Sequence, residues 1–254
     1  MKKAVLAILC IFALSACKKE DKQVEPAIPQ TPVIATGNLK GKVYHYDQFG
    51  TAYTNGLNTT TVSIEGKNYA TITDTAGRFT ISGVSSNTYT LIFKKPGCGM
   101  IKLEDIEYKV EDTLTYTAGV ADIPVFTISS AYAKDTSWFS NTLDGIYYNA
   151  STNPVNKNAS VVAIIGKSPK IDIANPSSYL NYATVSLVDT TEFNRFFSYS
   201  LLKFTYTFKK DSMLYMKIYP VATKAASYLN NKSNTLIYTA YGTPYPTVFT
   251  FNVQ

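Results

Sequence analysis

From residue 39 onward, hydrophobic and polar side chains alternate in short runs along the first half of the chain. Leu39, Val43 and His45 share one parity, and Lys40 and Lys42 take the other. Alternation with a period of two indicates strands that bury one face. The same pattern, interrupted by turn sequences such as 66–68 and 74–77, predicts strands at 39–46, 62–65, 69–73, 78–82, 89–94 and 101–108. Short strands separated by turns are typical of a β-sandwich.

The second half of the chain carries a similar but less regular pattern. Its strand candidates are 124–132, 160–165, 183–188, 202–208, 213–219, 235–241 and 248–253. Residues 202–208 and 213–219 flank the polar turn 209–212, which is the pattern of a hairpin. We therefore expect an all-β protein with two consecutive sandwiches, the second of an immunoglobulin or fibronectin-III type.

Several segments of the first half match one known pattern. They are 41–43, 62–64, 73–81 (TDTAGRFTI), 88–91 and 95–97. Together they resemble the carboxypeptidase regulatory-like domain, over about residues 38–110. The resemblance implies a transthyretin-like sandwich of seven strands. Known members of that family are accessory modules without catalytic residues, so the resemblance implies no chemistry.

The amino terminus has the order of an export signal. Lys2 and Lys3 precede an apolar run at 4–14, which is too short to span a membrane. The sequence LSAC at 14–17 follows and resembles a bacterial lipoprotein box. The resemblance implies cleavage before Cys17, a thioether-linked diacylglycerol on its sulfur and acylation of the new amine. An ordinary cleaved signal is the alternative.

These features predict four parts of the chain. Residues 1–16 are the signal peptide, 17–37 the lipidated cysteine with a proline-containing tether, 38–120 the first sandwich and 121–254 the second. The charged residues 18–21 (KKED) resemble the export signal of surface lipoproteins in the Bacteroidota. That resemblance implies an outer-membrane protein displayed on the cell surface, and a periplasm-facing anchor stays open as the alternative.

Composition narrows the functional classes. The chain of 254 residues is 45% hydrophobic and 17% charged, which is sufficient for a core. Without Lys2 and Lys3, 22 basic face 18 acidic side chains, a net charge of +4 that does not predict a nucleic-acid partner. The single histidine, His45, is expected to be packed or at a rim. Cys98 is expected to be a half-buried small residue without a disulfide partner.

No sequence motif of a nucleophilic, phosphate-binding or zinc-dependent enzyme is present, so we expect no catalytic residue, cofactor or metal. The acidic residues of 104–112 could offer oxygen ligands to calcium, but a solvated strand edge is the preferred interpretation.

Aromatic residues give the better functional indication, because their faces stack on sugars and protein groups. Trp138, Tyr147 and Tyr148 are the predicted ligand-binding residues, and Tyr44, Tyr46 and Tyr53 belong to the same exposed class. We expect a non-catalytic accessory protein that binds a glycan or a surface protein. A structural envelope lipoprotein and an enzyme-accessory module are the alternatives.

Overall fold

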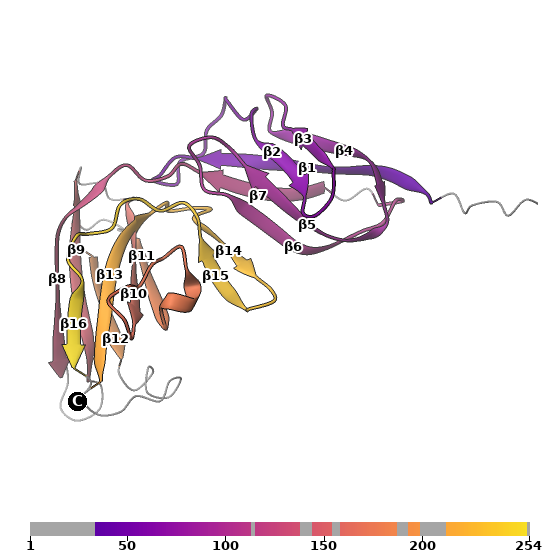
Figure 1. Cartoon of the computed structure of the whole chain (residues 1–254). Coiled ribbons are helices and arrows are strands. Elements are labelled where there is room, and N and C mark those ends of the chain that lie inside the picture. Colours follow the sequence, from indigo (N-terminus) through magenta and orange to yellow (C-terminus); the bar gives the residue numbers. More distant parts are fainter. Residues whose placement is uncertain are drawn as a thin grey trace, which may run out of the picture. The chain divides into compact units, whose positions relative to one another are not determined.

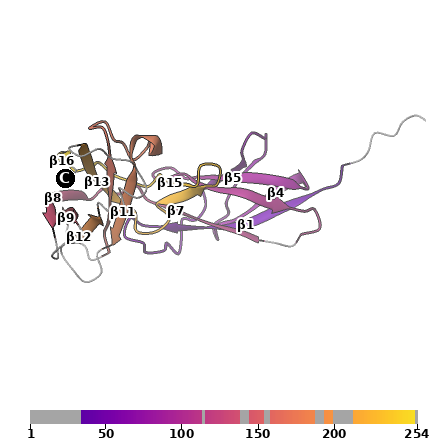
Figure 2. The ribbon, with the colours of Figure 1, turned by 90° about the horizontal axis from the view of Figure 1, so that it is seen from below.

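A computed structural model describes residues 34–112, 115–137, 144–153, 158–186, 193–198 and 212–252. These residues form strands joined by turns, with one short 3₁₀ segment, η1 (Pro176–Ser178) (Figures 1 and 2). Within this part of the chain, no helix is long and apolar enough to cross a membrane. The prediction of an all-β fold is confirmed.

The first seven strands build a sandwich of two sheets, called here the first sandwich. One sheet has the order β4-β1-β7 and the other β3-β2-β5-β6. Strand β1 pairs with β4 antiparallel and with β7 parallel. The bounds are β1 (Thr36–Tyr46), β2 (Thr61–Ile64), β3 (Ala70–Ile72), β4 (Arg78–Ser85), β5 (Asn87–Lys94), β6 (Ile101–Tyr108) and β7 (Thr115–Ala121).

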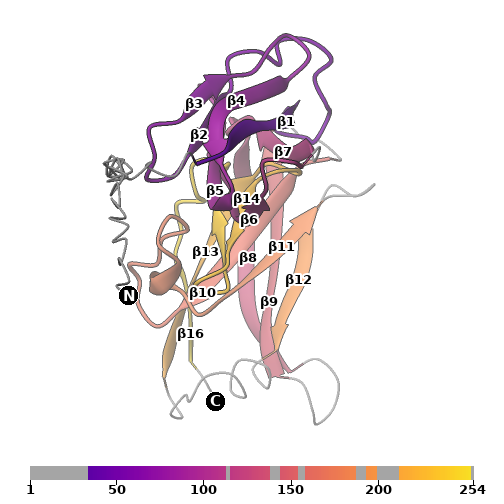
Figure 3. The same ribbon diagram turned by 90° about the vertical axis from the view of Figure 1, so that its right-hand side faces the viewer.

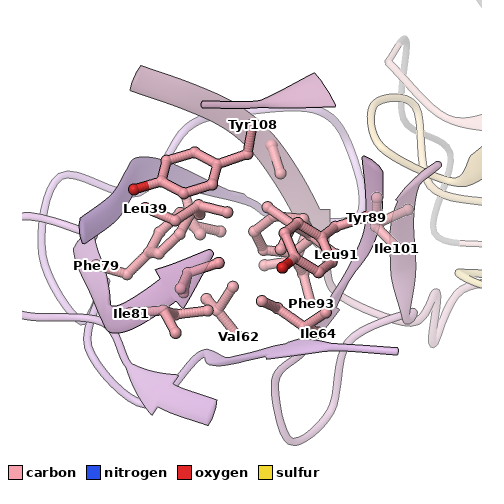
Figure 4. Close-up of a cluster of buried hydrophobic side chains, with 14 residues drawn as sticks. Leu39, Val62, Ile64, Phe79, Ile81, Tyr89, Leu91, Phe93, Ile101 and Tyr108 are labelled. Carbon is pink, nitrogen blue, oxygen red and sulfur yellow. The ribbon is translucent and has the colours of Figure 1, made fainter. Parts of the chain in front are cut away.

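The core of the first sandwich is built largely from residues that the alternation placed on one parity (Figure 4), and Ala118 and Val120 of β7 add to it. Leu39 and Val43 of β1 face Leu91 and other residues of the opposite sheet, and each is at most 1% exposed. Burying a side chain of this size contributes about 1.5–3 kcal/mol each. The edge of Phe79 meets the ring of Phe93, with centroids 5.9 Å apart.

The turn between β3 and β4 explains the TDTAGRF sequence. Oδ1 of Asp74 accepts hydrogen bonds from the backbone N–H of Ala76 at 2.9 Å and of Arg78 at 2.7 Å. Gly77 has a φ of 76°, and a Cβ added there would lie 2.3 Å from the carbonyl oxygen of Val43. The acceptor side chain and the glycine together aim Phe79 at the core.

The remaining strands form a second sandwich and one additional hairpin. Its sheets have the orders β12-β9-β8 and β11-β10-β13-β16 (Figure 3). The hairpin β14-β15 is a separate two-stranded sheet. The bounds are β8 (Thr127–Ser137), β9 (Asp144–Asn153), β10 (Ser160–Gly166), β11 (Asn181–Ser186), β12 (Phe193–Ser198), β13 (Met213–Val221), β14 (Ser227–Asn230), β15 (Thr235–Tyr238) and β16 (Phe249–Asn252).

Strand β10 is buried along its whole length because it has an apolar layer on each face. Val161, Ala163 and Ile165 contribute to the core between the two sheets. Val162 and Ile164 pack on the other side against a cluster that includes Ile171 of the segment before η1. The continuous apolar run of β10 is therefore the sequence of a central strand.

Four strands depart from the sequence expectation. Strand β7 was not predicted, because its small residues and Gly119 conceal the alternation. Strands β9, β12 and β14 were not predicted either. Strands β9 and β12 are rich in polar and aromatic residues, and β14 has only four residues, too few to show a repeat. The hairpin strand predicted at 202–208 lies outside the described residues. The domain boundary at 120/121 and the family of each sandwich stay predictions.

Candidate functional site

The residues predicted to bind a ligand are only partly described by the structure. Trp138 lies outside the described residues, as does the lipidation residue Cys17. Tyr147 and Tyr148 are in β9, where Tyr147 pairs with Phe196 and Tyr148 with Arg195 of β12. Their assignment as ligand-binding residues therefore stays a prediction.

The outer face of the β4-β1-β7 sheet combines cations with hydroxyl groups. On β1, Lys40 and Lys42 have the parity that points away from the core. Lys40 is paired with Thr80 of β4 and with Thr115 of β7, and Lys42 is paired with Arg78 of β4. We call the set Lys40, Lys42, Tyr44, Arg78, Thr80 and Thr115 the basic face.

The basic face keeps its positive charge within the part of the chain that the structure describes. Among the described residues, Lys40, Lys42 and Arg78 take part in no ion pair. The ammonium of Lys42 lies 4.7 Å from the ring centre of Tyr44, which is 38% exposed. Like charges directly opposite each other on a sheet are destabilising, so Arg78 across from Lys42 opposes folding.

A shallow hollow of about 240 Å³ lies within this face. Lys40, Lys42 and Arg78 line it together with the hydroxyl-bearing Thr80 and Thr115. Cations and hydroxyl groups around one hollow suit an anionic group that also carries hydrogen-bonding oxygens. The alternating K-x-K of 40–42 was visible in the sequence, but the position of Arg78 beside it depends on strand pairing.

A second group of functional side chains lies at one end of the first sandwich. It consists of His45, Cys98 and Asp122, with Tyr53 beside them, and is called here the His–Cys–Asp cluster. Residues 98 and 122 are joined by an isolated β-bridge. The N–H of Tyr53 donates to the carbonyl of His45 at 2.8 Å, and the N–H of Asp122 donates to the carbonyl of Tyr46 at 3.0 Å. Backbone bonds therefore hold all the segments that carry the cluster.

The side chains of the cluster converge on the Asp122 carboxylate. Nε2 of His45 lies 2.7 Å from Oδ1 of Asp122, and the hydroxyl of Tyr53 donates to Oδ2 at 2.7 Å. Sγ of Cys98 lies 3.3 Å from the same Nε2 and 3.5 Å from Oδ1. The ring of Tyr53 stacks on that of His45, with centroids 4.3 Å apart.

This arrangement shifts several proton equilibria. Burial raises the pKa of the Cys98 thiol to about 12, and the charge of Asp122 acts in the same direction. The hydrogen bond to Asp122, together with burial, raises the pKa of the Tyr53 hydroxyl to about 12. Burial alone would raise the pKa of Asp122, but hydrogen bonds from Tyr53 and His45 outweigh it and lower that pKa.

The cluster does not have the geometry of a cysteine nucleophile with a histidine base. Such a base accepts the thiol proton on one ring nitrogen while the carboxylate holds the other. Here Sγ of Cys98 and Oδ1 of Asp122 both approach Nε2 of His45. The raised pKa also keeps the sulfur protonated, whereas reactive cysteines have lowered pKa values.

The same three atoms are placed so that they could hold a metal ion. A nitrogen, a sulfur and an oxygen donor all lie within 4.8 Å of one another, and no other such group occurs in the described part of the chain. Sequence reasoning placed His45 on the buried face of its strand and Cys98 as half-buried, which is where both lie. It missed that they meet, because 53 and 77 residues separate His45 from Cys98 and Asp122.

The acidic stretch does not form a comparable site. Glu107 lies 3.5 Å from the ammonium of Lys109, and Asp112 accepts the backbone N–H of Lys109. Within the described ranges, no group of these carboxylates is close enough to share an ion. The solvated edge stays the interpretation that the sequence prefers.

Comparison with known proteins finds similarity among solved structures. No protein-family model matches the sequence, and no curated protein matches it. Solved structures with some similarity include a candidate carbohydrate-binding protein from Bacteroides uniformis, with 13% identity and a TM-score of 0.32 over 85% of this chain and 99% of that one. A DUF3823 family protein from Parabacteroides merdae has 15% identity and a TM-score of 0.27 over 82% and 98% of the two chains.

A further match is a chain of a type II cohesin–X-dockerin complex from Acetivibrio cellulolyticus. It has 19% identity and a TM-score of 0.29, covers 34% of this chain, and is itself covered over 58% of its length. Similarity at this level carries no functional argument, which therefore rests on the residues of this chain.

Proposed function

We propose that this protein is a lipid-anchored, non-catalytic binding protein of the bacterial outer membrane, displayed on the cell surface, and that it recognises an acidic glycan. The basic face of the first sandwich is the observation that carries the proposal. It gathers three cations, which have no carboxylate partner among the described residues, around a hollow with two hydroxyl groups and an exposed tyrosine beside them.

The ligand class follows from the chemistry of that face. Acid groups of a glycan would pair with the exposed cations Lys40 and Arg78, while its hydroxyl groups exchange hydrogen bonds with Thr80 and Thr115. The exposed ring of Tyr44 offers a stacking surface for a sugar. A hollow of about 240 Å³ admits one residue of such a chain, which suits an extended polymer more than an enclosed small molecule.

The anchor is supported by the sequence around Cys17. Each acyl methylene buried in the bilayer contributes about 0.8 kcal/mol, and a single chain binds only marginally. Two or three chains on one cysteine would hold the protein on the membrane. The KKED sequence after Cys17 supports export to the surface.

A binding role without catalysis is supported by the cluster geometry. His45 is the only histidine in the sequence, and its Nε2 is engaged by Asp122. A histidine base acting on a hydroxyl or thiol nucleophile elsewhere in the chain would therefore require this residue to leave its present partners.

Retention on immobilised polysaccharides tests the proposal. Acidic and neutral polymers of matched length would be compared with the wild-type protein and with Lys40→Gln, Lys42→Gln and Arg78→Gln, singly and combined. Exposed charge contacts contribute about 0.2–1 kcal/mol each, so single variants should weaken binding about 1.4- to fivefold and the triple variant about three- to 150-fold. Added salt should weaken wild-type binding in the same direction.

A control that loses two cations elsewhere, compared with the double variants of the face, separates this face from general basicity. Lys67→Gln with Lys170→Gln removes exposed cations that do not line the hollow. These two changes should leave retention unaltered. Equal loss in the control, or equal retention on neutral and acidic polymers, would contradict recognition by the basic face.

A further inference from the structure

We propose that Nε2 of His45, Sγ of Cys98 and Oδ1 of Asp122 together bind one Zn²⁺ ion. The inference does not rest on the glycan-binding proposal, because it concerns different residues and a different ligand. It also departs from the sequence expectation of no metal, since that expectation could not anticipate three distant residues meeting at one point.

The spacing of the donor atoms is close to that of a tetrahedral zinc site. With bonds of about 2.3 Å to sulfur and about 2.0–2.2 Å to nitrogen and oxygen, such ligands lie about 3.3–3.6 Å apart. The distances from Sγ of Cys98 are 3.3 Å to His45 and 3.5 Å to Asp122. The 2.7 Å contact between His45 and Asp122 would open by about 0.6 Å as the ion takes the place of their hydrogen bond.

The donor types fit this ion in charge and in softness. A thiolate and a carboxylate carry two negative charges, which neutralise Zn²⁺ in a site where the His45 side chain is only 12% exposed. Thiolate and imidazole ligands select zinc over Mg²⁺ and Ca²⁺, which prefer oxygen. Binding breaks the S–H bond of Cys98, forms a Zn–S bond and releases one proton to solvent. The hydrogen that Nε2 of His45 donates to Asp122 also leaves that nitrogen, and the neutral ring keeps its hydrogen on Nδ1 while Nε2 binds the ion.

The surroundings of the three ligands resemble an outer shell that orients them. The Tyr53 hydroxyl donates a hydrogen bond to Oδ2 of Asp122, and Oδ1 of that carboxylate faces His45 and Cys98. The ring of Tyr53 also stacks on the ring of His45. The backbone bridge between residues 98 and 122 fixes the separation of two ligands. Partners of this kind hold metal ligands in place before the ion arrives.

Three protein ligands leave one position of a tetrahedral ion unoccupied by protein. The Asp122 side chain is 33% exposed, so solvent reaches the site. A water molecule or a small anion would complete the coordination. This differs from a closed structural site, in which four protein ligands surround the zinc.

Cobalt substitution tests the site directly, because Co²⁺ bound to a thiolate gives a charge-transfer absorption band. The full chain, purified in detergent without an affinity tag, would be titrated with Co²⁺ and then with Zn²⁺. We expect one Co²⁺ per chain, a thiolate band, and its loss when one equivalent of Zn²⁺ displaces the cobalt. Bound zinc should also raise the midpoint of thermal unfolding.

Variants assign the band to the cluster. Cys98→Ser should abolish it, and Tyr53→Phe should keep it while weakening zinc binding about 10- to 100-fold. Glu111→Gln removes an exposed carboxylate outside the cluster and should change nothing. Circular dichroism would show that each variant folds, and Asp122→Asn replaces any variant that does not.

Two results would overturn the zinc site. One is wild-type protein that shows no thiolate band at saturating Co²⁺. The other is a zinc affinity that is the same in wild type, Cys98→Ser and Asp122→Asn. Neither result bears on retention by acidic polysaccharides, so the two proposals fail separately.

Discussion

Asp122 is the residue on which the chemistry of the first sandwich converges. Its carboxylate accepts a hydrogen bond from Tyr53 on one oxygen and contacts His45 on the other. The sequence around these residues gives no sign of a site. The shifted pKa values of Tyr53 and Asp122 come from contacts with residues far along the chain. These pKa values should therefore return towards their ordinary values when the protein unfolds.

Asp122→Ala should lower the pKa of Tyr53 from about 12 towards its ordinary value of 10.0, because the hydrogen bond to Asp122 is the largest cause of the shift. A tyrosine whose pKa is raised by folding stabilises the protein below about pH 10, and this contribution is lost as pH rises through about 12. Ring-labelled tyrosine spectra over an alkaline pH series would measure the change. Tyr219, whose pKa of about 12 comes mainly from burial, is the control and should not move. An unaltered Tyr53 titration in Asp122→Ala would disprove the assignment.

Trp138→Ala should weaken binding of the acidic polysaccharide by about fivefold or more, because an aromatic ring that stacks on a ligand contributes strongly to its binding. The midpoint of thermal unfolding should stay within the error of the wild type, since the ring is expected to be exposed. Tyr147→Ala and Tyr148→Ala would be measured beside it by the same retention assay. Wild-type retention in all three variants would remove these residues from the binding surface.

Strands whose own residues show an apolar pattern could be predicted from the sequence. Strands that form only because they pair with a neighbouring strand could not. The alternation in β1 and the apolar run of β10 are local patterns, so both strands were expected. Strand β7 is specified by its parallel pairing with β1, which no local pattern reveals. The His–Cys–Asp cluster was missed for the same reason, because its members come from different turns and strand ends.

Gly77→Ala and Gly83→Ala form a matched pair at the element scale, since both glycines have a φ near 75°. An added Cβ at Gly83 meets nothing within 4 Å, so this change should cost only the left-handed backbone, about 1–2 kcal/mol. At Gly77 the added Cβ also lies 2.3 Å from the carbonyl oxygen of Val43, and the cost should exceed that of Gly83→Ala by about 1 kcal/mol or more. Urea unfolding of both variants gives the difference. Equal losses would show that the turn relaxes without disturbing β1.

At the scale of the whole molecule, the fold class could be predicted from the sequence, whereas the basic face became visible only in the structure. The all-β architecture follows from the repeated alternation, whereas the basic face required the pairing of β1 with β4. The amino-terminal anchor and the boundary at 120/121 are predictions from sequence. The anchor can be tested on the protein in its native membrane.

Cys17→Ser should prevent lipid attachment and block cleavage of the signal peptide, because the acceptor sulfur is lost. Mass spectrometry of the wild-type protein should give the chain from Cys17 plus diacylglycerol and an amide-linked acyl group. Protease treatment of intact cells should degrade the wild-type protein if it faces the medium. A wild-type protein that is recovered without lipid in the soluble fraction would contradict the anchored topology.

The parallel pairing of β1 with β7 gives the first sandwich a mechanical property. The chain enters β1 at Thr36 and leaves β7 at Ala121, and the two strands are in register from Lys40 with Thr115 to Tyr46 with Ala121. Tension between these two ends acts along the strands and in opposite directions. Every rung of the ladder would then resist sliding at the same time, instead of opening one after another from an end. A tethered protein that holds a polymer under flow would be reinforced along this line of pull.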